Sequence, residues 1–223
     1  MRTMGRTKGQ DIYGSERRRR SPWGVLALVM LSGIALMRNG VDAGIGPPQP
    51  AAAASLGKHA GETFLPVPLE PLPYAPPTRV RVSSLKVDAP IMDVGLDEKG
   101  WIAAPPAQEP NLAGWFQNGV APGQRGTAVI VGHVDNQAGP AVFYGLGSVK
   151  PGDSVEVPRQ DGRTAVFEVY GVEVFSKTDF PGVRVYGDTG SPELRVITCG
   201  GGYSKTHGYD GNVVVFARMV KAR

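Results

Sequence analysis

Three residues with reactive or charged side chains interrupt runs of strand-forming residues. His133 follows the run 127–131, Cys199 follows the run 193–198, and Arg218 lies within a third run. A thiol, an imidazole and a guanidinium are suited to acyl transfer. The thiolate attacks a carbonyl, the histidine protonates the departing amine, and the cation stabilises the oxyanion. These residue types therefore predict a cysteine-dependent acyl-transfer site.

The nucleophile in this hypothesis is Cys199, which is the only cysteine of the chain and so has no internal disulfide partner. A cysteine gains thiolate character from a positive neighbour, and His133 or Arg218 could supply it. Arg195 lies four residues before Cys199 on the same predicted strand. Alternate side chains share a face, so Arg195 would lie on the same face as Cys199, about 13 Å away. Two alternatives stay open: an exported cysteine hydrolase, and a surface binding module with an inert, buried Cys199.

Four further polar residues lie near the candidate site in sequence. Thr198 either orients the turn at Cys199 or is an ordinary strand threonine. His207, in the glycine-rich stretch after Cys199, is either exposed or a substrate contact. Asp135 and Asn136 follow His133 closely and either hold its imidazole or form a turn.

Residues 78–223 contain short apolar or β-branched runs separated by turn signals such as 97–100 and 151–153. No long run has a 3.6-residue period, although 142–146 is compatible with one short helix. Many short strands with tight turns predict an all-β domain, either a closed barrel or a sandwich. We find no P-loop, dinucleotide fingerprint or zinc-binding pattern in the sequence, and we expect neither a cofactor nor a metal.

The residues before this domain predict export and membrane attachment. Residues 1–20 contain seven basic and two acidic side chains, a charge of +5 against +4 for the whole chain, which leaves −1 for the rest. This balance argues against nucleic-acid binding by the folded part. Residues 21–38, uncharged up to Arg38, predict a transmembrane anchor or signal segment after a basic cytoplasmic tail. The Pro/Ala-rich stretch 39–77 predicts an extended linker that separates the catalytic domain from the cell membrane.

Three stretches of the sequence resemble the sortase family. Residues 114–157 are similar to the segment around the sortase histidine, VITCGG to its cysteine strand end, and NVVVFARMV to its arginine strand. The resemblance covers about 80–220, and GHVD, PAVFY and GGGY are most similar to the actinobacterial class F group. It implies a closed eight-stranded sortase-type β-barrel with short helices.

The resemblance also implies a function and assigns roles to residues. It implies a cysteine transpeptidase that cleaves an LPXTG-like sorting signal between Thr and Gly and transfers the acyl group to a cell-wall amine. Its partners would be secreted proteins with sorting signals and a peptidoglycan-precursor amine, and we expect a monomer. The family's catalytic residues correspond to His133, Cys199 and Arg218.

In the family, the connection before the cysteine strand forms a wall of the substrate site. Here that connection is 175–191, and its apolar residues are Phe180, Pro181, Val183 and Val185. They are expected to contact the leucine and proline of the signal, or else to cap the barrel.

Overall fold

The computed structural model describes residues 46–55 and 69–223. The predicted basic tail and transmembrane segment, and much of the predicted linker, lie outside these residues. Within the described part, no helix combines the length and apolar character needed to cross a membrane.

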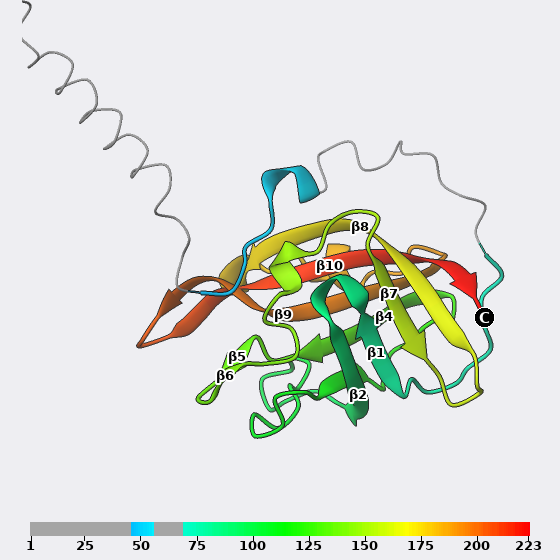
Figure 1. The fold of residues 1–223 in the computed structure, drawn as a ribbon, viewed down its shortest axis with the longest axis horizontal. Helices are drawn as coiled ribbons and strands as arrows, with labels where there is room; N and C mark the ends of the chain where they lie inside the picture. The colour runs from blue at the N-terminus through cyan, green and yellow to red at the C-terminus, as the bar shows by residue number, and fades with distance from the viewer. Residues whose placement is uncertain (1–45, 56–68) are drawn as a thin grey trace, which may run out of the picture. The chain divides into compact units, whose positions relative to one another are not determined.

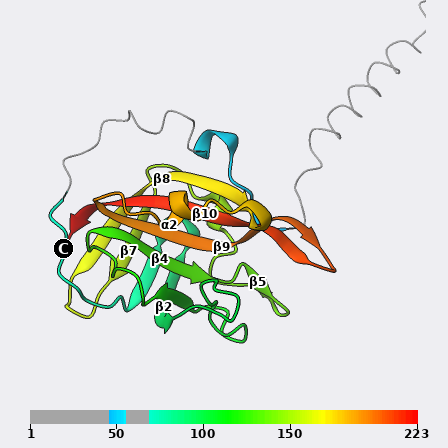
Figure 2. The same ribbon diagram turned by 180° about the vertical axis from the view of Figure 1, so that it is seen from behind.

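Eight strands close into a barrel in the order β1-β2-β3-β4-β9-β10-β8-β7 (Figures 1 and 2), which confirms the predicted fold class. The barrel strands are β1 (Arg79–Val82), β2 (Val87–Val94), β3 (Ala113–Phe116), β4 (Gly126–Gly132), β7 (Ser154–Pro158), β8 (Thr164–Ser176), β9 (Pro192–Ser204) and β10 (Gly208–Ala222). A separate hairpin consists of β5 (Asp135–Asn136) and β6 (Gly139–Pro140). The helices are short: η1 (Ala52–Ala54), η2 (Ser83–Leu85), η3 (Leu146–Ser148), η4 (Lys177–Asp179) and α2 (Gly182–Tyr186).

The barrel interior is filled by residues that alternate along the strands. On β8, Ala165, Phe167 and Val169 are buried and the residues between them are only partly covered. This period of two places one face of the strand inside the barrel. Phe143 and Leu146 also belong to the interior cluster, and the predicted short helix at 142–146 is a turn followed by η3.

Four neighbouring strands, β4, β9, β10 and β8, also bury side chains on the outside of the barrel. Val129, Ile197, Val214 and Phe216 form a second cluster there with Val185 from α2. The connection between β8 and β9 thus covers the outer face of these strands. Burial on both faces explains why β4, β9 and β10 contain continuous apolar runs, whereas β8, which is only partly buried on its outer face, keeps a clearer alternation.

Residues 69–77, predicted as part of the linker, pack against the barrel. Arg159 is buried and donates hydrogen bonds to the carbonyl oxygens of Pro73 and Pro122. It also pairs with Asp161, and this hydrogen-bonded guanidinium holds the pKa of the Asp161 carboxyl below its usual range. The folded unit therefore includes contacts from residues that precede Thr78.

Candidate active site

The candidate site lies where the parallel ladder between β4 and β9 ends, while β9 itself continues to Ser204. Their ladder runs to the pair Val131 and Ile197, so His133 and Cys199 each follow two residues later, on strands about 4.8 Å apart. The buried Thr198 hydroxyl donates a hydrogen bond of 2.8 Å to the Gly132 carbonyl oxygen. This bond joins β4 and β9 just past their ladder, one residue before His133 on one strand and one residue before Cys199 on the other. The sequence prediction that His133 and Cys199 lie together is consistent with this register.

Gly132 allows the chain to pass close to the core just before His133. A Cβ at this position would lie 2.6 Å from side-chain carbons of both Val142 and Phe143, closer than real Cβ contacts. The backbone of Phe143 also donates a hydrogen bond to the His133 carbonyl oxygen at 3.0 Å. The glycine and the turn after it therefore set the position of the histidine.

The imidazole of His133 is half-buried and is held by one nitrogen. Its Nε2 lies 2.7 Å from the Pro105 carbonyl oxygen. Because a carbonyl only accepts, Nε2 carries a hydrogen here, and Nδ1 is the nitrogen left to exchange a proton with substrate. No hydrogen bond joins His133 to Cys199 among the residues that the structure describes.

Asp135 and Asn136 act as turn residues and do not hold the imidazole. Asp135 accepts a hydrogen bond from the Tyr209 hydroxyl, which links the β5–β6 hairpin to β10. The Asn136 side-chain amide donates to the Ala107 carbonyl oxygen, and its oxygen accepts from the Ala138 backbone. The sequence left open whether Asp135 and Asn136 hold the imidazole or form a turn, and the structure favours the turn.

Cys199 is partly exposed and lines a pocket of about 440 Å³. Thr198 and Asn212 lie beside it in the wall of this pocket, and the loop before β3 contributes a second wall. Residues that line the pocket are Asp97, Lys99, Trp101, Ile102, Ala104, Val131, Gly132, Lys177, Tyr186, Ile197, Thr198, Cys199 and Asn212. A thiol in this position is reachable from solvent, contrary to the expectation for a buried, inert cysteine.

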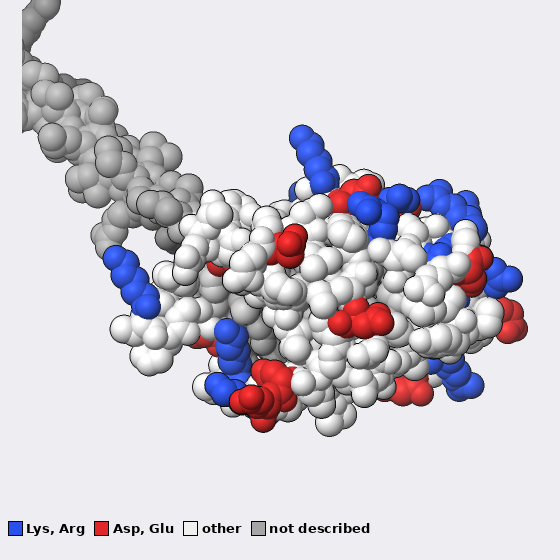
Figure 3. Space-filling model, turned by 90° about the horizontal axis from the view of Figure 1, so that it is seen from below, with Lys and Arg blue, Asp and Glu red and all other residues white. Residues whose placement is uncertain are grey.

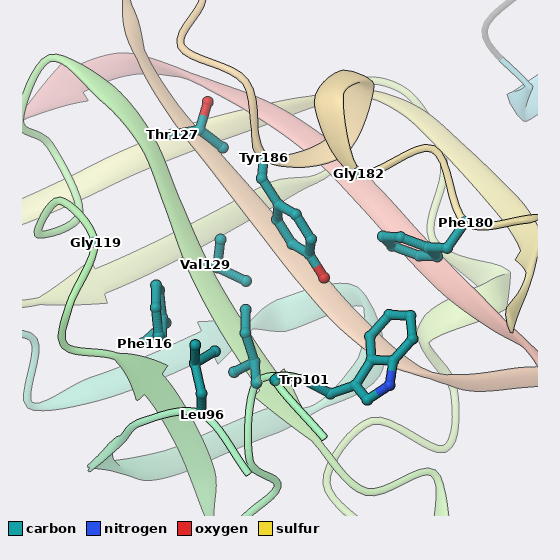
Figure 4. A pocket seen from close by; sticks show the side chains of 11 residues that line it. Leu96, Trp101, Phe116, Gly119, Thr127, Val129, Phe180, Gly182 and Tyr186 are labelled. Carbon is teal, nitrogen blue, oxygen red and sulfur yellow. The ribbon is translucent and has the colours of Figure 1, made fainter. Parts of the chain in front are cut away.

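A second, mainly apolar pocket of about 450 Å³ adjoins the cysteine pocket (Figure 4). The two share Trp101, Ile102 and Tyr186 as lining residues. In Figure 4, Tyr186, Phe180 and Trp101 surround one side of the space, while Leu96 and Phe116 lie on the other and Val129 lies between them. A peptide in the cysteine pocket can therefore extend into an apolar site without leaving the surface.

The β8–β9 connection contributes to this site, but through fewer of the predicted residues than expected. Phe180 lines the apolar pocket and packs edge-on against Trp101, with ring centroids 6.3 Å apart. Pro181 only precedes α2 and lines neither pocket described above. Val183 is 92% exposed and Val185 is fully buried, and neither lines a pocket described above. Val185 packs on the outside of the barrel, which is the alternative expectation of a capping role. On a one-turn helix, neighbouring valines point in different directions.

Arg218 does not meet Cys199, and that prediction is wrong. The β9–β10 ladder pairs Cys199 with Asn212 and pairs Arg218 with Glu193. Arg218 therefore lies six residues, about 20 Å, along the strand from the thiol. Its guanidinium is 3.6 Å from a Glu168 carboxylate oxygen, and its buried Nε has no partner in the described structure.

Arg195, the other arginine considered, is buried and engaged in structural contacts. Its Nε donates to the Val185 carbonyl oxygen at 3.1 Å, and Nη2 is 2.6 Å from a Glu193 carboxylate oxygen. The same carboxylate accepts a hydrogen bond of 2.8 Å from the Tyr170 hydroxyl, and burial raises the pKa of Tyr170 above its usual range. Arg195 thus fastens α2 to β9 and is not directed at the thiol.

His207 lies away from both pockets. It is exposed in the turn that joins β9 to β10, where its Nδ1 is 2.9 Å from the Thr206 hydroxyl. The β9 residues from Cys199 to Ser204 separate this turn from the thiol by about 17 Å. The expected contact of His207 with substrate is therefore not supported by its position.

On the face of the folded unit shown in Figure 3, acidic side chains lie beside and between the basic ones, so the charges on this face are mixed in sign.

The chain is similar in fold to several solved sortase structures. Sortase SrtA from Actinomyces oris superposes with a TM-score of 0.51 at 22% identity, covering 71% of this chain and 87% of its own. Sortase A from Listeria monocytogenes gives 0.50 at 18% identity, covering 67% and 90%. A lid mutant of sortase A from Corynebacterium diphtheriae gives 0.51 at 21% identity, covering 64% and 69%. At these identities the similarity establishes the fold alone.

A sequence comparison gives the family. No curated protein sequence matches this chain at a significant level. The sortase domain, however, matches residues 80–220, which include the whole of the pocket walls described above. Because this match covers more than half of the chain, the protein belongs to the sortase family.

Proposed function

We propose that this protein is a membrane-anchored cysteine transpeptidase that cleaves an LPXTG-like sorting signal between Thr and Gly. It transfers the resulting acyl group to a cell-wall amine. Sortases typically act as cysteine transpeptidases on sorting signals, and one observation carries the proposal for this chain. Cys199 opens into a pocket that continues into an apolar pocket on the same surface.

In the first half of the reaction, the Cys199 thiolate attacks the threonine carbonyl carbon and a carbon–sulfur bond forms. The tetrahedral oxyanion then collapses, the carbon–nitrogen bond breaks, and His133 gives a proton to the departing glycine amine. Nδ1 is the donor, because Nε2 is engaged with the Pro105 carbonyl oxygen. The product is a thioester between Cys199 and the threonine of the signal.

In the second half, an incoming amine attacks the thioester carbonyl. His133 removes a proton from this amine, the new amide bond forms, and the thiolate of Cys199 leaves. The apolar pocket lined by Phe116, Val129 and Phe180 receives the leucine side chain of the signal. Burial of one such side chain contributes about 1.5–3 kcal/mol, which favours a signal with an aliphatic residue at that position.

The cellular setting is proposed from the sequence. The basic residues 1–20 and the uncharged stretch up to Arg38 support an uncleaved anchor with the catalytic domain outside the cell. Secreted proteins with sorting signals and a peptidoglycan-precursor amine are the partners. The GHVD, PAVFY and GGGY stretches support a class F enzyme.

The proposal is tested with the full chain in detergent, a panel of LPXTG and LAXTG peptides, and a competing amine. Mass spectrometry should find peptides that end in threonine joined to the amine. Cys199→Ala should form no such product, and a Cys199→Ala protein that retained activity would refute the assignment. A product with water in place of the amine, even at high amine concentration, would favour the exported hydrolase.

A further inference from the structure

The cysteine pocket contains two positively charged side chains, and neither is an arginine. They are Lys99 and Lys177, whereas Arg218 and Arg195 are remote from the thiol or committed to other partners. An acyl-transfer site needs a positive group or hydrogen-bond donors where the oxyanion develops.

Lys177 is positioned by the strand register. On β8, Phe175 pairs with Asn212 of β10, which in turn pairs with Cys199 of β9. Side chains that pair across a sheet project from the same face, so these three lie in one row on the outer face. Lys177 follows Phe175 by two residues, at the start of η4, and lines the pocket with Cys199 and Asn212.

One hydrogen bond holds the Lys177 side chain at this place. Its Nζ donates to the Tyr209 carbonyl oxygen on β10 at 2.7 Å. An ammonium group has three donors, so two remain for a substrate. Lys99 is exposed in a turn closed by the Asp97 carboxylate, which accepts hydrogen bonds from the Lys99 and Trp101 backbones. The negative charge of that neighbour makes Lys99 the weaker candidate.

We propose that Lys177 is the cationic catalytic residue of this enzyme and that it binds the oxyanion formed on attack by Cys199. The amide of Asn212, opposite Cys199 in the ladder, supplies a second, neutral donor. The inference rests on the proposed acyl transfer and assigns to a lysine on the β8–β9 connection the role that the sequence resemblance gave to Arg218.

The test compares kcat and KM for a cleaved sorting peptide among four variants of the full chain. Loss of one oxyanion donor typically lowers kcat on the order of 10²- to 10³-fold. Lys177→Met should show a decrease of this size with KM little changed, and Lys177→Arg should recover most of the activity because it restores the positive charge. Lys221→Met, an exposed lysine that lines neither pocket, and Arg218→Met should stay within roughly 2-fold of wild type.

Folding and access are checked separately. Lys177 is exposed, so its variants should keep the thermal unfolding midpoint and the rate at which iodoacetamide alkylates Cys199. Three results would each overturn the inference: full activity in Lys177→Met, equal losses in Lys177→Met and Lys177→Arg, or a loss in Arg218→Met as large as that in Lys177→Met. Wild-type protein that is inactive on every peptide would instead contradict the proposed function.

Discussion

At the scale of single residues, Thr198 has the most direct influence on the geometry of the site. Its buried hydroxyl bonds the Gly132 carbonyl oxygen, so one contact fixes the relative positions of the residues before His133 and Cys199. Productive attack and proton transfer both depend on such positions, because small displacements of catalytic groups are costly.

Replacing Thr198 by Val keeps the shape of the side chain and removes this hydrogen bond. We expect unfolding free energy to fall by about 1–3 kcal/mol, because a buried carbonyl loses its partner. We also expect kcat/KM to fall roughly 10-fold as the strand ends separate. Thr198→Ser is the matched control and should retain most of both quantities. Chemical denaturation and peptide kinetics measure the effects, and wild-type kinetics in Thr198→Val would contradict the positioning role.

At the scale of elements, the parallel pairing of β4 with β9 brings the histidine and the cysteine together. The sequence alone does not give this pairing: it places His133 and Cys199 after strand-forming runs, and the resemblance to the sortase family is what predicted that they lie together. The all-β class was predictable because short strand-forming runs recur between strong turn signals, whereas closure into a barrel was expected only from the resemblance to the sortase family.

The register of the β9–β10 hairpin could not be predicted in the same way. Asn212 and Arg218 are an even number of residues apart, so both side chains face the outer side of the barrel, as Cys199 does. The alternation of side chains alone does not tell which of the two lies opposite Cys199. The choice depends on the turn at 204–208 and on the register shift between Tyr209 and Gly211. Lys177 and Trp101 were missed because they come from connections, whose placement follows from tertiary packing.

The close approach of β4 to the 142–143 turn yields a prediction at the same scale. Gly132→Ala should lower the unfolding free energy by about 1–3 kcal/mol, since the added methyl overlaps Val142 and Phe143. It should also lower kcat/KM, because His133 is the next residue. Gly95→Ala is the control, since a Cβ there has no neighbour within 4 Å. An alanine at 132 with unchanged stability would show that the turn is not packed as described.

At the scale of the whole molecule, the barrel serves as a rigid support for one groove on its outer surface. The strands β4, β9, β10 and β8 are packed on both faces, and Arg195 fastens α2 to them. The β8–β9 connection then supplies Phe180 and Tyr186 to the apolar pocket and Lys177 to the cysteine pocket. In the proposed reaction, this one connection supplies both the apolar side chains that receive the signal and the cation that binds the oxyanion.

The most direct test of this account is to identify the covalent adduct that the full chain forms with an LPXTG peptide when no amine acceptor is added. Intact-mass measurement followed by peptide mapping at mildly acidic pH locates the adduct. The account predicts a thioester on Cys199 whose added mass corresponds to the peptide truncated after threonine. An acyl group on another residue, or cleavage of the peptide by Cys199→Ser at the wild-type rate, would contradict it.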